Sequence, residues 1–298
     1  MLLSAVITLD PLDDAAHQTN ARQVQRWFKD TLEAADPALF ARLHEPNTTR
    51  AYTLSAVQPA RDGYPAWLRI TSLDADLSTR LVEDVLPQLE HNGTIMLDPR
   101  NQQARFAITS IDCGERNAIP FQTRDVDLHN PATWAGHTNL AALISGIGRM
   151  HKPTSPRLSL EFATCTSFRL NAPHGFKANL PLPIPRYVFQ SYLHQWEALA
   201  PANLLVPMAP ILEHYVWISF HRIRMALESF GGGTRGKTVG FAGRVEFSVA
   251  RRDDLPDDLR PDWQHYVDML YLLAAYSFFC GTGIRTTHGL GQTLPLLP

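Results

Sequence analysis

The chain has 298 residues, a length typical of one large domain or of two domains of about 150 residues each. Its composition, 45% hydrophobic and 19% charged, permits a large buried core and excludes a disordered chain. The formal net charge of −2 excludes a uniformly basic surface for nucleic acid, although it leaves room for a local basic groove.

The cysteines and the apolar stretches predict a soluble protein of a reducing compartment. Cys113, Cys165 and Cys280 lie far apart without a CxxC pair, which excludes a disulfide scaffold and a thiolate zinc site. The start, MLLSAVITLD, lacks the basic residues of a signal peptide. The longest apolar run, residues 270–280, is shorter than the roughly 20 residues that span a bilayer. We therefore expect a cytoplasmic protein with no membrane partner.

The first half predicts the order strand, helix, strand, strand, helix, strand. Residues 2–9 form a short apolar run that ends at an Asp-Pro turn. Apolar residues recur at helical spacing within residues 21–34 and 76–88. Further strands are expected at residues 52–57, 67–73, 94–97 and 105–111. With the last two strands as an extra hairpin, this order is the ferredoxin-like βαββαβ plan.

The second half repeats this plan loosely, without a residue-level repeat. A short helix within residues 131–152 leads to a linker at Lys152 and Pro153, so the expected domains are residues 1–152 and 153–298. The predicted elements are strand 157–163, helix 186–199, strands 216–225 and 239–249, helix 263–279 and strand 292–296. The predicted fold class is α+β, with two tandem ferredoxin-like (βαββαβ, RRM-like) domains and a C-terminal glycine-rich loop.

One motif matches the phosphate-binding pattern GxxxxGK[ST], at Gly231, Gly236, Lys237 and Thr238. A true phosphate loop opens a helix, whose N-terminal N–H groups and dipole hold the phosphates. Here the next segment, TVGFAGRVEFSV, contains two glycines and alternates like a strand, and only 60 residues remain after Thr238. A nucleotide hydrolase is therefore a disfavoured alternative.

A second glycine cluster frames the segment TGIRTTHGLG, with Gly281 just before it, Gly283 near its start, and Gly289 and Gly291 at its end. Such a loop offers many N–H groups and little side-chain bulk, so its backbone can approach a phosphodiester chain closely, and Arg285 adds charge. The alternative is a flexible turn. Two glycines on each side of a Thr-Thr-His core exceed what a turn requires.

The charge distribution in the second half favours a polyanionic partner. Residues 149–186 contain six Lys or Arg residues against one acidic residue, Glu161. Residues 231–252 contain five basic residues against Glu246 alone. The alternative is a pair of solvated faces whose charge is compensated elsewhere, as the overall balance allows.

His44 is the candidate for chemistry in the first half. It lies in LFARLHEPNTTRAYTLS, between a helix and the second strand, with Arg50 six residues later. A loop histidine can exchange a proton near neutral pH, and a guanidinium can stabilise charge on a phosphate. Taken alone, a histidine in such a position is more often an ordinary surface residue than a catalyst. The histidines show no HxxxH or HExxH spacing, so no metal site is predicted.

Several segments together resemble the CRISPR-associated endoribonucleases that process repeat RNA, in the RAMP superfamily of paired ferredoxin-like domains. The most specific part is GFAGRVEFSV, followed by an apolar helix and AAYSFFCGTGIRTTHGLGQ. The segments LHEPNTTRAYTLSAV, TWAGHTNLAALI, ATCTSFR and LPLPIPRYVFQSYLHQWEAL agree in order. The resemblance therefore spans nearly the whole chain and is looser in the N-terminal half.

The resemblance implies catalytic roles for His44, at the position of the family's histidine, and for Arg50, where relatives often have lysine. Some relatives add a tyrosine from the first helix, but this chain reads RWFKD there. The third role stays open: Lys29, Tyr52, Ser55 or no residue fills it. The implied reaction needs no metal or cofactor. The ribose 2′-OH attacks the adjacent phosphate and leaves a 2′,3′-cyclic phosphate and a 5′-OH.

The implied partner is CRISPR repeat RNA, as precursor and as mature guide RNA; other CRISPR effector subunits and a homodimer stay open. The expected RNA-binding residues lie in the basic second half and the glycine-rich loop. They are Arg235, Lys237, Arg244, Arg285, Thr286, Thr287, His288, Gly281, Gly283, Gly289 and Gly291. The alternative function is a non-cleaving RNA-binding subunit of a CRISPR effector with the same fold.

Overall fold

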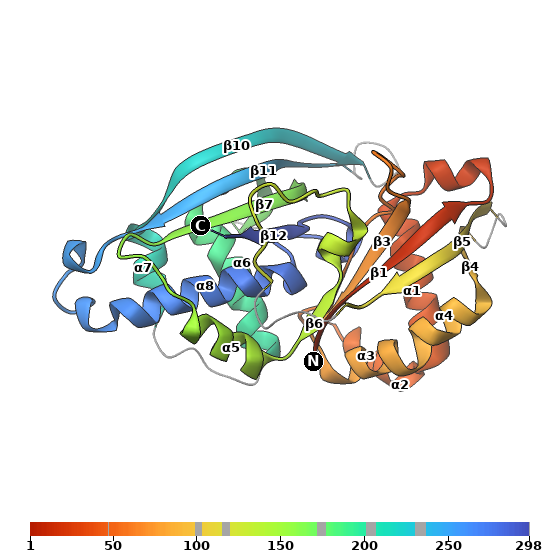
Figure 1. Ribbon diagram of the computed structural model, residues 1–298, viewed down its shortest axis with the longest axis horizontal. Helices are drawn as coiled ribbons and strands as arrows, with labels where there is room; N and C mark the ends of the chain where they lie inside the picture. Colours follow the sequence, from red (N-terminus) through yellow and green to blue (C-terminus); the bar gives the residue numbers. More distant parts are fainter. Residues whose placement is uncertain are drawn as a thin grey trace. The chain divides into compact units, whose positions relative to one another are not determined.

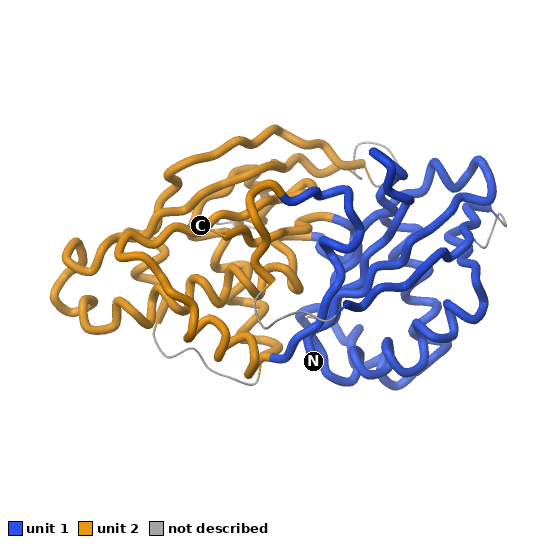
Figure 2. Tube along the Cα trace, viewed as in Figure 1, with its two compact units in different colours: residues 1–116, 126–139, 285–289 blue, residues 117–125, 140–284, 290–298 orange. Residues whose placement is uncertain are grey.

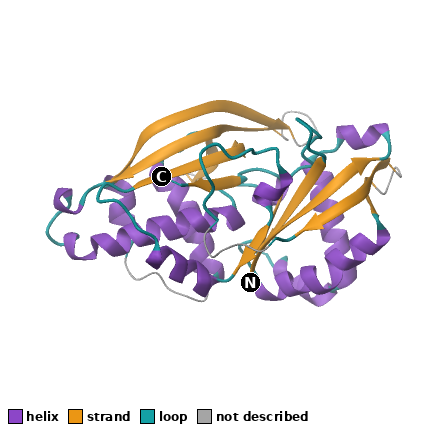
Figure 3. Ribbon diagram, viewed as in Figure 1, coloured by secondary structure: helices purple, strands orange, loops and turns teal. Residues whose placement is uncertain are grey.

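The computed structural model describes residues 1–46, 48–98, 103–114, 120–171, 177–200, 207–229 and 237–297. Contacts divide the chain into two compact units (Figure 2). Unit 1 comprises residues 1–116, 126–139 and 285–289, and unit 2 comprises residues 117–125, 140–284 and 290–298. Each unit contains an antiparallel sheet with helices along one face (Figures 1 and 3).

Unit 1 has the strand order β2-β3-β1-β5-β4, with β6 paired to β1. The ferredoxin-like plan places the fourth strand beside the first, and β5 occupies that position while β4 adds the extra hairpin strand. Its strands are β1 (Leu2–Pro11), β2 (Tyr52–Leu54), β3 (Ala66–Ser72), β4 (Thr94–Asp98), β5 (Gln103–Asp112) and β6 (Gly136–Thr138). Its helices are α1 (Ala21–Ala35), α2 (Pro37–Leu43), α3 (Ala75–Arg80) and α4 (Leu86–Asn92), with 3₁₀ turns η1 (Asp14–Gln18) and η3 (Pro131–Trp134).

The junction of α1 and α2 brings the chain to the candidate site. α1 begins with a capping box between Asn20 and Gln23, which satisfies N–H groups at its start. Asp36 ends α1 and also caps α2, where its side chain accepts a hydrogen bond from the Leu39 N–H. Pro37 follows at the start of α2, where its missing N–H costs nothing. The chain therefore turns into a second, short helix that ends at His44.

Unit 2 repeats the plan with the strand order β10-β11-β7-β12. The fourth strand, β12, again lies beside the first, β7, so both halves have the predicted ferredoxin-like topology and the predicted fold class is confirmed. The strands are β7 (Arg157–Thr166), β8 (Phe168–Asn171), β9 (Lys177–Leu180), β10 (Val216–Ser229), β11 (Lys237–Val249) and β12 (Thr293–Leu296). The helices are α5 (Leu140–Arg149), α6 (Pro185–Leu199), α7 (Ala209–His214) and α8 (Trp263–Cys280).

α8 carries the core of unit 2, because it is buried almost all round from Tyr266 to Cys280. The helices of the described ranges include none that is long and apolar enough to cross a membrane.

The two units divide the chain differently from the predicted boundary between residues 152 and 153. α5 lies against α8 in unit 2, and the Lys152 Nζ atom lies 2.7 Å from an Asp268 carboxylate oxygen on α8. Lys152 is therefore a buried part of unit 2 and not an exposed linker residue. Residues 285–289 belong to unit 1 although the segments on both sides of them belong to unit 2.

Candidate active site in unit 1

His44 lies at the C-terminal end of α2, and hydrogen bonds orient both of its ring nitrogens. Its Nδ1 atom is 2.9 Å from the Phe40 carbonyl oxygen, and its Nε2 atom is 2.9 Å from the Tyr52 hydroxyl. A carbonyl can only accept, so Nδ1 donates to Phe40, and Nε2 of the neutral ring accepts from Tyr52. The lone pair of Nε2 is therefore held at Tyr52, the first residue of β2.

Burial lowers the pKa of His44 below its ordinary value, and the positive charges of Lys29 and Arg50 lower it further. The Phe40 carbonyl and the Glu33 carboxylate act in the opposite direction. The ring is neutral at neutral pH and can accept a proton there, which is the state that a general base requires.

Among the candidates for the third catalytic role, Tyr52 forms a hydrogen bond with His44. Its side chain is buried, and its ring centroid lies 4.9 Å from that of Phe28 on α1. Burial raises the pKa of Tyr52 to about 12, so its hydroxyl keeps its proton and donates to His44. Ser55 has a structural role, since its buried Oγ atom accepts a hydrogen bond from the Arg69 N–H on β3.

Two cations accompany His44. The Arg50 guanidinium donates to the Leu43 carbonyl at the end of α2, over 2.7 Å, and its charge lowers the pKa of both His44 and Tyr52. Lys29, half-buried on α1, lowers the pKa of His44 and also that of His288 in the glycine-rich loop. The predicted catalytic set of His44, Arg50, Tyr52 and Lys29 thus lies together in unit 1.

Two glycines of the C-terminal loop are required by the chain's own backbone. A Cβ atom on Gly289, whose φ is +83°, would lie 2.8 Å from the Ala56 nitrogen just after β2. A Cβ atom on Gly291, whose φ is +68°, would lie 2.0 Å from the Thr282 carbonyl oxygen. These close approaches explain the glycines without RNA. The RNA contacts of this loop therefore remain a prediction.

The 3₁₀ turn η8 (Thr286–His288) lies against α1 and β2. Thr286 and Thr287 are buried, while His288 is half-buried. Arg285 precedes the turn with a left-handed φ of 59°. The tip of the glycine-rich loop is therefore part of the wall of the candidate site.

The basic residues of unit 2 are partly paired. Arg244 on β11 lies directly opposite Glu161 on β7, with its Nε atom 3.2 Å from the carboxylate, and it also donates to the Arg124 carbonyl over 2.6 Å. Arg124 in turn pairs with Glu246 over 2.9 Å. The two acidic residues that the sequence sets against the basic stretches therefore neutralise part of the predicted RNA-binding charge.

Lys237 is exposed at the first position of β11, and Thr238 beside it is buried. The segment after the GxxxxGK[ST] pattern is thus a strand, as predicted, so no helix N-terminus follows it to hold a phosphate. Gly231, Arg235 and Gly236 lie outside the described residues.

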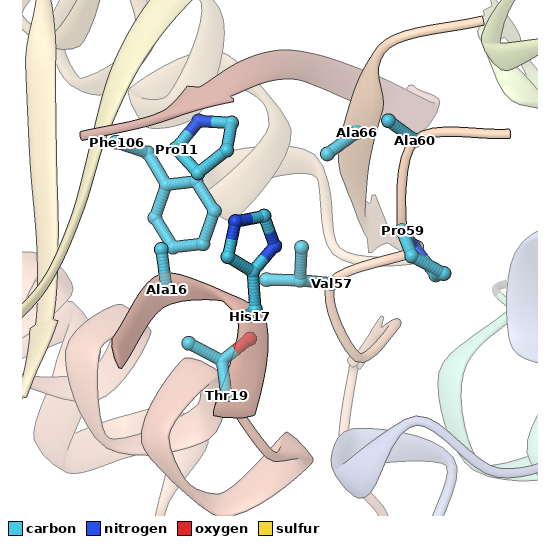
Figure 4. Close-up of a pocket in the computed structure, with 9 residues that line it drawn as sticks. All are labelled: Pro11, Ala16, His17, Thr19, Val57, Pro59, Ala60, Ala66 and Phe106. Carbon is cyan, nitrogen blue, oxygen red and sulfur yellow. The ribbon is translucent and has the colours of Figure 1, made fainter. Parts of the chain in front are cut away.

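A cavity of about 340 Å³ lies elsewhere in unit 1, and His17 points into it (Figure 4). Its lining residues are Pro11, Ala16, His17, Thr19, Val57, Pro59, Ala60, Ala66 and Phe106. None of the predicted catalytic residues belongs to this lining. The cavity is therefore distinct from the His44 site.

The match to a family model covers residues 160–293, and the family is the CRISPR-associated endoribonuclease Cas6. No curated protein matches the chain. Among solved structures, a Cas6 product complex has a TM-score of 0.72 at 22% identity, over 99% of this chain and 100% of the other. A Cas6 substrate-mimic complex has a TM-score of 0.67 at 22% identity, over 99% and 98%. Thermus thermophilus Cas6 has a TM-score of 0.62 at 20% identity, over 99% and 98%.

The fold, with two ferredoxin-like units in one chain, is thus shared with solved Cas6 structures and with a solved RAMP protein. The family match and the shared fold confirm the resemblance predicted from the sequence. Over residues 160–293 the chain is similar to the Cas6 family of CRISPR-associated endoribonucleases.

Proposed function

We propose that this protein cleaves CRISPR precursor RNA within the repeat and so generates guide RNAs. The observation that carries the proposal is the state of His44: the ring is neutral, and its Nε2 lone pair faces the Tyr52 hydroxyl. The match of residues 160–293 to an endoribonuclease family supports it. Arg50 and Lys29 provide positive charge beside it, as the binding of a phosphate requires.

The proposed reaction is metal-independent. On binding, the ribose 2′-OH replaces the Tyr52 hydroxyl as the donor to His44 Nε2. His44 takes the proton as the 2′-oxygen attacks the adjacent phosphorus, and the bond from phosphorus to the 5′-oxygen breaks. The 5′-oxygen takes up a proton from water, and His44 later returns its proton to water, so the products are a 2′,3′-cyclic phosphate and a 5′-OH. Arg50 and Lys29 stabilise the additional negative charge on the phosphate in the transition state.

The test of this function is incubation of the purified protein with its host's repeat RNA in EDTA, beside the same RNA with a single 2′-deoxy sugar at the cut. We expect cleavage at one site in EDTA, and no cleavage of the 2′-deoxy RNA, because the deoxy sugar lacks the nucleophile. The products are identified by gel electrophoresis and by mass spectrometry of the cyclic phosphate. Cleavage of the 2′-deoxy RNA, or a strict requirement for a divalent cation, would contradict the mechanism.

Replacing Tyr52 by phenylalanine tests the hydrogen bond at Nε2. The tyrosine hydroxyl stabilises the neutral form of His44, so its loss raises the pKa of His44. A general base is active only when deprotonated, and the Tyr52 hydrogen bond exists before RNA binds, so we expect the acidic limb of the pH profile of kcat/KM to move to higher pH. The plateau rate stays close to that of the wild type, because the base itself remains. An unmoved limb would show that Tyr52 does not set the basicity of His44.

A further inference from the structure

We propose that His288 is a second catalytic residue, which donates a hydrogen bond from Nε2–H to a non-bridging oxygen of the phosphate that is cut. This role rests on the proposed function. The sequence pattern places His288 among residues expected to bind RNA, whereas here it acts on the reacting phosphate itself. His288 keeps its proton throughout, so no bond to it forms or breaks.

The hydrogen bonds around His288 determine which ring nitrogen carries the proton. The Nδ1 atom lies 3.1 Å from the Thr287 hydroxyl and 3.4 Å from the Gln25 side-chain nitrogen. The Gln25 nitrogen also lies 3.3 Å from the Thr287 hydroxyl. An amide nitrogen can only donate, so Nδ1 is an acceptor and the neutral ring carries its proton on Nε2. Gln25 and Thr287 are thus positioning residues for a fixed Nε2–H donor.

The charges around His288 keep the ring neutral and make its surroundings attractive to an anion. Burial lowers its pKa to about 4, and the positive charges of Arg285, Arg22 and Lys29 contribute. The imidazole therefore remains a neutral hydrogen-bond donor over the pH range in which an RNA-cleaving enzyme works. A neutral histidine beside cations can stabilise a developing oxyanion without giving up a proton.

The same face of α1 links His288 to the His44 site. Arg22, Gln25 and Lys29 follow one another at intervals of three and four residues, so their side chains lie on one face of the helix. Lys29 lowers the pKa of His44 as well as that of His288, which places both rings within reach of its charge.

The loop and the base also meet at β2. Gly289, next to His288, approaches the backbone of Ala56 just after β2, and β2 begins with Tyr52, the partner of His44. A phosphate bound at Lys29 therefore lies near both the base and the His288 donor, because the charge of Lys29 acts on both rings. This arrangement aims a hydrogen bond at the place where negative charge grows.

The experiment compares His288→Ala and His288→Gln, with His91→Ala as a matched control on the exposed end of α4 in the same unit. The single-turnover rate of repeat-RNA cleavage is measured with saturating protein from pH 6 to 9, a range of about three units that includes the ordinary histidine pKa. Affinity is measured with 2′-deoxy RNA. We expect His288→Ala to lower the saturated rate about 10²-fold, as loss of one oxyanion donor does, with little change in affinity.

We expect His288→Gln to regain most of the rate, because its amide N–H replaces the Nε2–H donor. We also expect both variants to keep the shape of the wild-type pH profile, since a neutral donor does not titrate there. Wild-type affinity for the 2′-deoxy RNA establishes that a variant is folded.

Three results would overturn the role of His288. In the first, His288→Ala weakens binding but cleaves at the wild-type rate when saturated. In the second, the cleavage rate of His288→Gln is as low as that of His288→Ala, so a hydrogen-bond donor at this position does not restore the rate. In the third, the basic limb of the pH profile disappears, which would make His288 a titrating acid. Wild-type cleavage that His44→Ala abolishes and His288→Ala leaves intact would refute this role alone. Absence of cleavage by the wild type would refute it together with the proposed function.

Discussion

Replacing His44 by alanine is expected to lower the rate of repeat-RNA cleavage about 10²–10⁴-fold, the usual contribution of a general base. The His44 ring is neutral, and its acceptor atom, Nε2, lies 2.9 Å from a donor, the Tyr52 hydroxyl. Among the described residues, its side chain forms hydrogen bonds with Tyr52 and with the Phe40 carbonyl, so its loss leaves the sheet intact. The measurement is the single-turnover rate with saturating protein.

The matched control for His44→Ala is His17→Ala, which removes an exposed histidine from the separate cavity of the same unit. This control is expected to cleave like the wild type, and both variants are expected to bind 2′-deoxy RNA with unchanged affinity. If His44→Ala cleaves at the wild-type rate, another residue is the base. If the wild type binds repeat RNA tightly without cutting it, the chain is instead a non-cleaving RNA-binding subunit of an effector.

Replacing Gly291 by alanine is expected to cause the largest loss of stability among substitutions in the glycine-rich loop. The new Cβ atom would lie 2.0 Å from the Thr282 carbonyl oxygen, and the φ of +68° is itself strained for alanine. The nearest atoms on the opposing side belong to the Thr282 backbone, so no side chain can rotate away. We expect the free energy of unfolding to fall by about 2 kcal/mol or more, measured by urea denaturation.

Gly148→Ala serves as the opposite control. Gly148 lies within α5, and nothing lies within 4 Å of the Cβ atom that alanine would add there. Alanine in a helix interior is favoured over glycine by roughly 0.5–1 kcal/mol, so this variant is expected to be slightly more stable than the wild type. Equal denaturation midpoints for the two variants would show that the contact between Gly291 and Thr282 does not hold the loop.

The sequence predicts the main elements well because their periodicity is strong. The apolar residues Val24, Phe28 and Leu32 recur on one face of α1, and the alternation in β11 marks it as a strand. α2 is not predicted, because seven residues give too few turns for a periodic signal. The single helix expected at residues 76–88 is instead α3, a π turn (Leu81–Val85) and α4. Pro87 near the start of α4 lacks the N–H that a regular helix needs.

The candidate site is only partly predictable, because it depends on contacts between distant parts of the chain. The resemblance identifies His44 and Arg50, and it leaves Tyr52 among several candidates. The hydrogen bond between Tyr52 and His44 depends on where α2 ends and β2 begins, which no local pattern gives. The position of His288 beside Gln25 joins residues 263 apart in the sequence.

The charge pattern of the second half shows the same limit. Counting residues predicts a basic surface, but the pairing of β7 with β11 places Glu161 opposite Arg244. An acidic residue directly opposite a basic one neutralises it, and a count of charged residues does not show this pairing.

The assignment of residues 285–289 to unit 1 has a consequence for the newly made chain (Figure 2). Ribosomes add roughly 5–20 residues per second, and domains generally fold as they emerge. The sheet of unit 1 can pair long before the segment that packs on α1 and β2 has been synthesised. On the proposed mechanism, a nascent chain that has folded its first hundred residues still lacks His288. Full nuclease activity then begins only after His288 has been synthesised, so a shorter nascent chain is a poor enzyme toward nearby RNA.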